Sequence, residues 1–233
     1  MDLKETDILG DSIGEHWYYA SKAAATRRLL GEAPIKRILD VGAGSGFFSH
    51  HLLARTGAHE AWCVDISYPA ESTASTGGKP VHYRRAIDTV DADLVLLMDV
   101  LEHVDDDLGL LKSYVDKVPS GSRFLMTVPA FQFMWSGHDD FLEHKRRYTL
   151  RQFESLTRNA GLTVEKGAYY FGAVFPIAVA SRLIPGGSKP RSQLKKHHPL
   201  VNTLLKTLCS LELPLMGMNR LAGLSVFVLA RKP

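Results

Sequence analysis

The chain has 233 residues, of which 45% are hydrophobic and 23% charged, and its formal net charge is +3. This length suits one large hydrophobic core, so we expect a single domain over residues 1–233. The small net charge gives no basis for nucleic-acid binding. The isolated Cys63 and Cys209 indicate neither a disulfide framework nor a zinc site.

The first residues, MDLKETDILGDSIGEHW, are acidic and lack the apolar centre of a secretory signal. The longest apolar stretch, FGAVFPIAVASRLI, is too short to span a bilayer and contains Pro176. We therefore expect a cytoplasmic protein.

Strand-like and helix-like segments alternate along the chain. In order, we expect a helix over 13–30, a strand over 36–41, a helix over 47–55, strands over 61–65, 81–85 and 94–99, a helix over 105–118, a strand over 122–128, a helix over 150–160, and strands over 163–170 and 224–230. Such alternation is typical of βαβ units around a mainly parallel sheet.

The predicted fold class is α/β, with a doubly wound, seven-stranded mixed sheet and helices on both faces. Four parts make up the expected domain: an N-terminal helical lid (1–33), a core (34–170), a helical insertion or cap (171–223) and the last strand (224–233).

A glycine loop, DVGAGSG (40–46), directly follows the first strand. Glycine permits a tight turn and a close approach of the backbone to a ligand. The nicotinamide fingerprint needs a small residue where Phe47 stands, and a P-loop needs a lysine followed by Ser or Thr. The remaining ligand has no pyrophosphate, and its ribose meets an acidic residue at the end of the second strand. Asp65 in AWCVDIS stands there.

Four stretches of the chain together resemble the class I S-adenosylmethionine-dependent methyltransferases. They are LDVGAGSGFFS, VDIS, DLVLLMDVLEHVDDD and GSRFLMTVP. The resemblance covers residues 36–170, and 224–230 fits the last antiparallel strand of that family. EHWYYASK and GHDDFLEHKRRYT further resemble a bacterial subgroup with an HWW-type block before the first strand and an HD…H.RRY block after the fifth. Its members often accompany polysaccharide or natural-product genes.

The resemblance implies S-adenosyl-L-methionine as cofactor. The glycine loop would line the methionine part, Asp65 would bind the ribose, and Ile66 and Asp88 would face the adenine. The implied cofactor contacts are Asp40, Gly42, Ala43, Gly44, Gly46, Asp65, Ile66, Asp88, Met98, Asp99 and Val100.

The block WSGHDDFLEHKRRYT follows the fifth strand, on the rim where open α/β sheets bind ligands. A histidine held by a carboxylate there can act as a general base, and Asp140 and His144 stand four apart, as on one helical face. His138, Asp140 and His144 could instead hold a metal ion, or the block could form a polar network that fixes a loop. We predict His144, His138 and Asp139 as catalytic and assign no metal ligands.

Further residues are expected to contact the acceptor. Trp17, Tyr18 and Tyr19 belong to the lid, where they either cover the acceptor or dock the helix. His103, at the start of the helix after the fourth strand, either orients the acceptor or terminates the turn. Arg146 and Arg147 would bind an anionic acceptor or form a solvated basic face. The acidic run 105–107 is expected at a helix N-terminus.

The segment 186–199 is rich in Gly, Pro and Lys and is expected to be a basic linker. An apolar stripe follows it, formed by Leu200, Leu204, Leu205, Leu208, Leu211 and Leu215. Burial as a cap is the favoured interpretation of this stripe; a dimer contact and a helix lying on a membrane surface are the others.

The predicted function is methyl transfer from S-adenosylmethionine to the O or N of a small-molecule acceptor, with an anionic acceptor favoured by the basic run. A second hypothesis is methylation of a lipid-linked sugar or envelope glycan at the membrane surface. From other classes, we retain an NAD-dependent oxidoreductase and a non-catalytic cofactor-sensing subunit. We expect a small-molecule partner and no nucleic acid, and a homodimer remains open.

Overall fold

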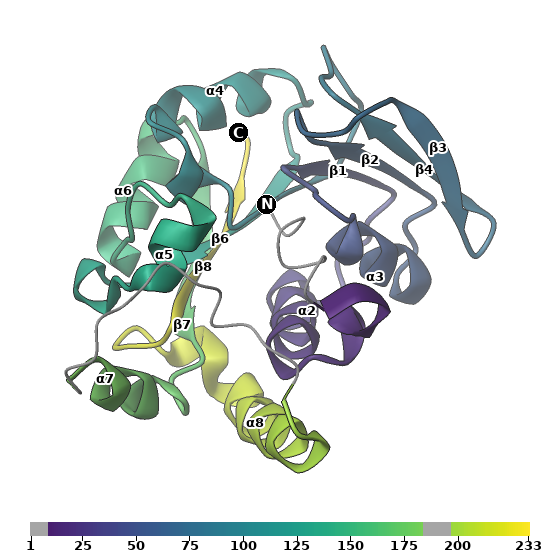
Figure 1. The fold of residues 1–233 in the computed structure, drawn as a ribbon. Helices are drawn as coiled ribbons and strands as arrows, with labels where there is room; N and C mark the ends of the chain where they lie inside the picture. The colour runs from purple at the N-terminus through teal and green to yellow at the C-terminus, as the bar shows by residue number, and fades with distance from the viewer. Residues whose placement is uncertain (1–8, 184–196) are drawn as a thin grey trace.

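The computed structural model describes residues 9–183 and 197–233 (Figure 1). Most of the predicted basic linker and the first eight residues of the lid lie outside these ranges. The described residues form an eight-stranded sheet in the order β3-β4-β2-β1-β5-β6-β8-β7. Its strands are β1 (Arg37–Val41), β2 (Glu60–Val64), β3 (Ser72–Thr76), β4 (Lys79–Arg84), β5 (Leu94–Met98), β6 (Arg123–Pro129), β7 (Thr163–Tyr170) and β8 (Ser225–Arg231).

The sheet is mixed, as predicted. Strands β4, β2, β1, β5 and β6 are parallel neighbours, and β8 lies antiparallel between β6 and β7. The expected count of seven strands is wrong by one, because β3 pairs antiparallel with β4 through a turn at Gly77 and Gly78, both with positive φ. Strand β3 is an exposed edge strand of small polar residues, so it carries no apolar pattern that would reveal it.

Helices cover both faces of the sheet (Figure 1). They are α2 (Trp17–Leu30), α3 (Phe47–Arg55), α4 (Asp107–Asp116), α5 (Gly137–Leu142), α6 (Leu150–Asn159), α7 (Phe175–Leu183) and α8 (Pro199–Glu212), with short 3-10 turns η1 (Gly10–Glu15), η2 (Leu101–His103), η3 (Gln132–Met134) and η4 (Leu213–Met218). One core contains buried residues of α2, α3 and α8, and the other contains those of α4 and α6. The prediction of a doubly wound sheet is confirmed.

The central strand β5 explains why two cores form. All five of its residues are buried and apolar. Leu94 and Leu96 belong to the first core, whereas Val95 and Leu97 belong to the second. Because side chains alternate across a strand, an unbroken apolar run is what a sheet covered on both faces requires.

Polar side chains at helix starts set where the helices on the second face begin. The side chain of Thr149 accepts from the amide of Gln152, which closes a capping box at the start of α6. Asp106 accepts from the amide of Gly109 at 2.8 Å and caps α4. The acidic run thus lies at a helix N-terminus, as expected. His103, however, lies in η2, before α4, so its predicted position at the start of this helix is wrong.

The segment 171–223 leaves and re-enters the sheet at neighbouring positions. The amide of Leu224 donates to the carbonyl of Tyr170 at 2.9 Å, and a Cβ at Gly223 would collide with that carbonyl. Helix α8 is held by the Tyr170 hydroxyl, which donates to the carbonyl of Cys209 at 3.0 Å. The amide of Trp17 also donates to Asn202 Oδ1 at 2.8 Å.

The predicted burial of the apolar stripe on α8 is wrong for most of its members. Leu200, Leu204 and Leu211 of α8 are 75%, 60% and 71% exposed, and Leu215 of η4 is 64% exposed, whereas Cys209 of α8 is fully buried. Helix α8 therefore docks through Cys209 and presents leucines to the surroundings. Within the described ranges, no helix combines the length and apolarity needed to cross a bilayer.

Candidate functional site

A cavity of about 380 Å³ opens at the carboxyl ends of β1, β5 and β6. Residues from α2, α5, α7 and α8 complete its wall. This is the edge of an open α/β sheet at which ligands bind. The cavity therefore brings together residues from the lid, the core and the insertion.

The glycine loop connects the carboxyl end of β1 to the start of α3 at this edge of the sheet. Gly42, Gly44 and Gly46 all have φ in the left-handed region, at 62°, 54° and 74°, which glycine adopts at little cost. The amide of Gly42 donates to the carbonyl of Val64 at 2.7 Å, and the amide of Gly44 donates to Asp65 Oδ2 at 3.1 Å. The loop is thus fastened to the end of β2, beside the predicted ribose carboxylate.

The surroundings of Asp65 fit a nucleoside. The other carboxylate oxygen accepts from the amide of Ser67 at 2.9 Å, so the side chain is held in one orientation. Ile66, the next residue, is 81% exposed. An exposed apolar side chain beside an oriented carboxylate suits a ligand whose ribose binds the acid and whose flat base covers the isoleucine.

The predicted cofactor residues divide into two groups. Asp40, Gly42, Ala43, Met98 and Asp99 line the cavity, whereas Gly44, Gly46, Asp65, Ile66, Asp88 and Val100 lie outside its lining. Asp88 is exposed, and Val100 is buried in the core on the α4 and α6 face. The cavity therefore includes the residues at which the methionine part of the cofactor is expected. We call its opposite part, lined by His138 and His144, the acceptor end.

Asp99 stands at the junction of these two ends in a strained conformation. Its φ is 58°, in the left-handed region that aspartate tolerates better than most residues. It accepts from Thr127 Oγ1 at 2.9 Å and from the Tyr18 hydroxyl at 3.4 Å, and it pairs with Lys22. Burial alone would raise the pKa of Asp99, but the Lys22 ammonium outweighs it and lowers that pKa.

Lys22 was missed by sequence reasoning. Its side chain is 0% exposed and comes from the middle of α2. The available signal was its position four residues after Tyr18, which places both side chains on one face of the helix. A lysine among small residues, in ASKAAAT, is otherwise typical of a solvated position.

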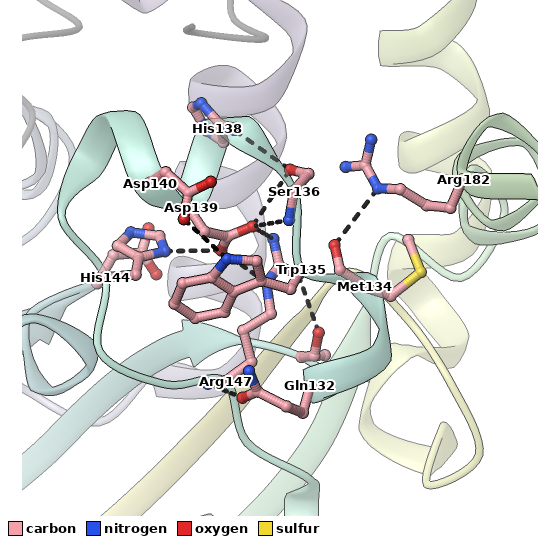
Figure 2. A network of polar contacts seen from close by, with 12 residues as sticks. Gln132, Met134, Trp135, Ser136, His138, Asp139, Asp140, His144, Arg147 and Arg182 are labelled. Atoms are coloured by element: carbon pink, nitrogen blue, oxygen red, sulfur yellow. Dashed lines mark hydrogen bonds and ion pairs between the residues drawn. The ribbon is translucent and has the colours of Figure 1, made fainter. Parts of the chain in front are cut away.

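At the acceptor end, Asp139 is the centre of a polar cluster (Figure 2). Fully buried, it accepts from His144 Nδ1 at 2.8 Å and from the Arg147 guanidinium at 2.7 and 3.0 Å. Burial raises the pKa of Asp139, but the hydrogen bonds from His144 and Arg147 outweigh it and hold that pKa well below its usual value. The carboxylate therefore stays ionised and orients both partners.

The predicted pairing of Asp140 with His144 is wrong. Helix α5 ends at Leu142, and Glu143 takes a left-handed conformation with φ of 60°, so His144 does not continue the helix. Asp140 is exposed and accepts from the Trp135 indole at 2.9 Å, as Figure 2 shows. Asp139 replaces it as the partner of His144.

His138 lines the cavity as predicted for a site residue, but in an uncharged form. Burial lowers the pKa of His138 to about 4, against the opposing effect of the Asp139 carboxylate. The metal grouping with Asp140 and His144, considered as an alternative from the sequence, does not form. In the part of the chain that the structure describes, the His/Asp/Glu side chains close enough to share an ion are Glu102, His103 and His144.

Glu102 and His103 come from the turn η2 and line the same cavity. Glu102 is fully buried, and neither of its carboxylate oxygens has a hydrogen-bond partner among the described residues. Burial and the nearby Asp99 raise the pKa of Glu102 well above its usual value. Burial, helped by His144, lowers the pKa of His103 to about 3. Sequence reasoning had not selected Glu102.

The HKRRY block fastens the turn η2 to the acceptor end. The amide of Lys145 donates to the carbonyl of Glu102 at 2.7 Å. Arg146 donates to the carbonyls of Val104 and Asp105 at 3.1 and 2.8 Å. Arg146 is not among the residues that line the cavity, whereas Arg147 is.

All three lid aromatics line the cavity. Tyr18 stacks on Phe171 at a centroid distance of 5.0 Å, and Trp17 meets the same ring edge-on at 5.6 Å. Tyr19 is buried and packs against Phe47. These three aromatic residues therefore both cover the cavity and pack helix α2 against the rest of the protein. The insertion adds Leu205, a member of the apolar stripe, and lining residues that the sequence did not indicate, Ile177, Ala178, Ser181 and Arg182.

Comparisons with solved structures show that this fold is shared widely. A chain of the complex between a Haloferax volcanii methyltransferase activator and its methyltransferase partner has a TM-score of 0.58 and 16% identity, covering 95% of this chain and 92% of that one. A candidate methyltransferase of Bacillus halodurans has a TM-score of 0.55 and 12% identity, covering 90% and 98%. The [4+2]-cyclase SpnF has a TM-score of 0.53 and 15% identity, covering 92% and 80%.

These likenesses establish the fold alone, and the cyclase shows that the fold does not by itself imply methyl transfer. None of the curated proteins matches the chain. The family model described as "Methyltransferase domain" matches residues 15–166, which is more than half of the chain. The chain therefore belongs to the methyltransferase domain family and is a class I S-adenosylmethionine-dependent methyltransferase.

Proposed function

We propose that this enzyme transfers the methyl group of S-adenosylmethionine to an oxygen or nitrogen of a small, partly apolar acceptor that carries negative charge. The observation that supports this most is one continuous cavity, whose lining runs from Gly42 and Asp99 to His138 and His144. One continuous space can hold the donor's methyl group against an acceptor.

On the donor side, Asp65 binds the ribose, Ile66 covers one face of the adenine, and Gly42 and Met98 line the methionine end. S-adenosylmethionine supplies a methyl group bonded to a cationic sulfur. The transfer is an in-line displacement, so holding the two reactants in the right orientation supplies much of the acceleration. Lys22 contributes by holding Asp99 in its strained conformation beside this junction.

On the acceptor side, the wall combines apolar groups with the guanidinium groups of Arg147 and Arg182. Trp17, Leu142 and Ile177 supply apolar surface. Burial and the neighbouring Arg147 lower the pKa of Arg182, whereas the Asp139 carboxylate opposes this, and the guanidinium stays charged. An acceptor carboxylate or phosphate would interact favourably with this guanidinium.

We further propose that the Asp139–His144 pair activates the acceptor and that His138 contacts it as a neutral imidazole. Asp139 accepts a hydrogen bond from Nδ1 of His144, so Nε2 is the nitrogen that can react with the acceptor. That nitrogen can take a proton from the acceptor, or it can coordinate a metal ion that lowers the acceptor's pKa.

Calorimetry with S-adenosylmethionine, followed by turnover to S-adenosylhomocysteine over phenols, amines and carboxylic acids, tests this function. Asp65→Asn should weaken cofactor binding by about 1.5–3 kcal/mol, the usual loss for hydrogen bonds to a charged group. Asp91→Asn is the matched control, because Asp91 pairs with Arg37 and does not line the cavity. Binding of NAD in place of S-adenosylmethionine would contradict the proposal, and binding without turnover of any acceptor would favour a sensing subunit.

A second candidate function is methylation of a lipid-linked sugar or envelope glycan. The exposed leucines of α8 favour it, since their helix also contributes Leu205 to the cavity wall. An apolar helix face beside the acceptor site suits an acceptor that is presented at a membrane surface.

A further inference from the structure

We propose that Glu102, His103 and His144 bind a divalent cation of the zinc class at the acceptor end of the cavity. This inference rests on the proposed function and specifies how the acceptor is activated. It also replaces the metal grouping considered from the sequence, of which only His144 remains.

The geometry brings one ligand atom from each of the three residues within 4.8 Å of the others. Ligand atoms around a tetrahedral zinc ion, with bonds of about 2.0–2.2 Å, lie roughly 3.3 Å apart. To bind zinc, the ligand atoms would have to move closer together by roughly an ångström or more. Rotation of the side chains about their own bonds can produce such a movement. The rings of His103 and His144 are nearly perpendicular, at 88° with centroids 4.6 Å apart, so they do not stack on each other.

Glu102 is the observation that points to a cation. A fully buried carboxyl group normally has hydrogen-bond partners, because burying it without them costs several kcal/mol. Neither carboxylate oxygen of Glu102 has a hydrogen-bond partner among the described residues. The backbone carbonyl of Glu102, in contrast, accepts from the amide of Lys145 at 2.7 Å. A cation bound by this carboxylate, with both imidazoles beside it, would satisfy the group.

The residues behind the two imidazoles complete the arrangement. His144 donates through Nδ1 to Asp139 Oδ1, which also accepts from Arg147 Nε, and this leaves Nε2 of His144 as the coordinating nitrogen. The backbone of Leu142 lies near His103 and raises its pKa, in the manner of a hydrogen-bond acceptor. Histidines that bind metals almost always use their second nitrogen in this way, because the partner sets the tautomer and the orientation of the ring.

The donor set determines the class of ion. Two imidazoles and one carboxylate suit zinc, with an open position for substrate, whereas magnesium prefers oxygen ligands. Since methyl transfer involves no change of redox state at a metal, a redox-inert ion is sufficient. All three residues line the same cavity as Met98 and Asp99. The open position therefore faces the space assigned to the acceptor.

The chemistry is balanced without a further reactant. An acceptor hydroxyl that coordinates the ion has a lower pKa and releases its proton to solvent. The oxygen then forms a bond to the methyl carbon of S-adenosylmethionine as the carbon–sulfur bond breaks, and the electron pair of that bond stays on sulfur. The products are the methyl ether and S-adenosylhomocysteine.

The test measures zinc binding directly. Full-length protein is stripped with a chelator and dialysed, and Zn²⁺ is then titrated by calorimetry, with the bound metal quantified by mass spectrometry. We expect one ion per chain in the wild type and no measurable effect of Mg²⁺. Asp139→Asn should raise the Kd for Zn²⁺ about 10–100-fold, as is usual for loss of a group that orients a ligand. Glu102→Gln and His144→Gln should raise it at least as much.

Glu60→Gln is the matched control, because Glu60 also faces a histidine, His82 at 3.0 Å, but lies outside the cavity. It should leave the Kd unchanged. Near-UV circular dichroism and binding of S-adenosylmethionine show that each variant is folded. Absence of bound zinc in the wild type, or equal binding in all variants, would overturn the proposal.

Turnover in the same stripped protein separates this proposal from the function on which it rests. Full methyl transfer after chelation would refute the role of the metal ion in activating the acceptor and leave His144 as a general base. Failure of the folded wild type to bind S-adenosylmethionine would instead refute the proposed function, whatever the zinc result.

Discussion

Lys22 and Asp99, 77 residues apart, form an ion pair in the cavity wall in which the lysine side chain is fully buried. Burial alone would lower the pKa of Lys22, but the Asp99 carboxylate outweighs it and raises that pKa above the usual value. The pair joins the lid helix α2 to the end of β5. It therefore couples the orientation of the lid to the conformation of a residue beside the cofactor site.

Removing the cation should destabilise the protein. In Lys22→Met, Asp99 would remain as a partly buried carboxylate without its counter-ion, which costs about 3 kcal/mol. Urea denaturation at pH 7 measures this loss. The double change Lys22→Met and Asp99→Asn should recover part of it, because the uncompensated charge is gone and asparagine tolerates the left-handed φ. A single variant as stable as the wild type would contradict the role assigned to the pair.

The glycine loop should not accept a side chain at its last position. Gly46 has φ of 74°, and a Cβ there would lie 3.1 Å from Tyr83 Oη and 3.3 Å from Cys63 Sγ. Gly46→Ala should cost about 1–2 kcal/mol of stability and also weaken cofactor binding, measured by calorimetry. Gly121→Ala is the control, since its φ is 88° with no atom within 4 Å. It should lose stability and keep cofactor affinity; equal affinity in both variants would argue against the loop as the binding element.

The two parallel hydrogen bonds of the Arg147 guanidinium should matter more for turnover than its positive charge. Its guanidinium makes two hydrogen bonds to Asp139, at 2.7 and 3.0 Å, which a lysine cannot reproduce. Arg147→Lys should lower turnover roughly 10–100-fold while cofactor affinity stays the same, because Asp139 and His144 lose their common orientation. Steady-state kinetics with Arg151→Lys as an exposed control checks this. Normal kcat in Arg147→Lys would show that charge alone is sufficient.

Acid should destabilise the protein through His51. Burial, with Arg55 and Arg27 nearby, lowers the pKa of His51 from 6.5 to about 4. Between these values the unfolded chain binds a proton that the folded chain does not, so stability rises with pH over this window by up to about 1.4 kcal/mol per pH unit. Denaturation of wild type and His51→Gln from pH 4 to 7.5 should give a shallower slope in the variant. If the stability of both proteins depended on pH in the same way, the lowered pKa of His51 would be contradicted.

The exposed face of α8 makes a prediction for the membrane hypothesis. Leu204 and Leu211 lie on one face of the helix and are 60% and 71% exposed. Wild-type protein should co-sediment with anionic liposomes, and changing both residues to Glu should abolish this, because charge opposes insertion of the face. Ser210→Glu, an exposed polar position on the same helix, is the control. If the wild type stays in the supernatant at every salt concentration, the face is not a membrane contact.

The sheet and its helices were predictable because their signals are local. Buried strands read as apolar runs, as in β5, and Thr149 with Gln152 marks the start of α6 by chemistry alone. Strand β3 was not predictable in this way, since an exposed edge strand needs no apolar side chains. For α8, the apolar periodicity correctly predicted a helix. The predicted burial was wrong, because periodicity does not show whether an apolar face packs against the rest of the protein.

The candidate site was predictable only in part, because its chemistry depends on contacts between distant segments. Asp139 and His144 are close in sequence, yet their pairing follows from the left-handed Glu143, which no periodicity reveals. Lys22 meets Asp99 only when α2 packs on the sheet. Glu102 lies between a predicted strand and a predicted helix, and its backbone meets the amide of Lys145, 43 residues further along the chain, only in the folded protein.

The hydrogen bond between Leu224 and Tyr170 also bears on how such an enzyme can change its substrate. Tyr170 and Ser225 are paired neighbours in β7 and β8, so the chain between them starts and finishes at one point of the sheet edge. An insertion anchored in this way can vary in length without a change in the register of the two strands. Because this segment supplies Ile177, Arg182 and Leu205 to the cavity, we expect variation in it to change the shape of the cavity and to leave the glycine loop unchanged.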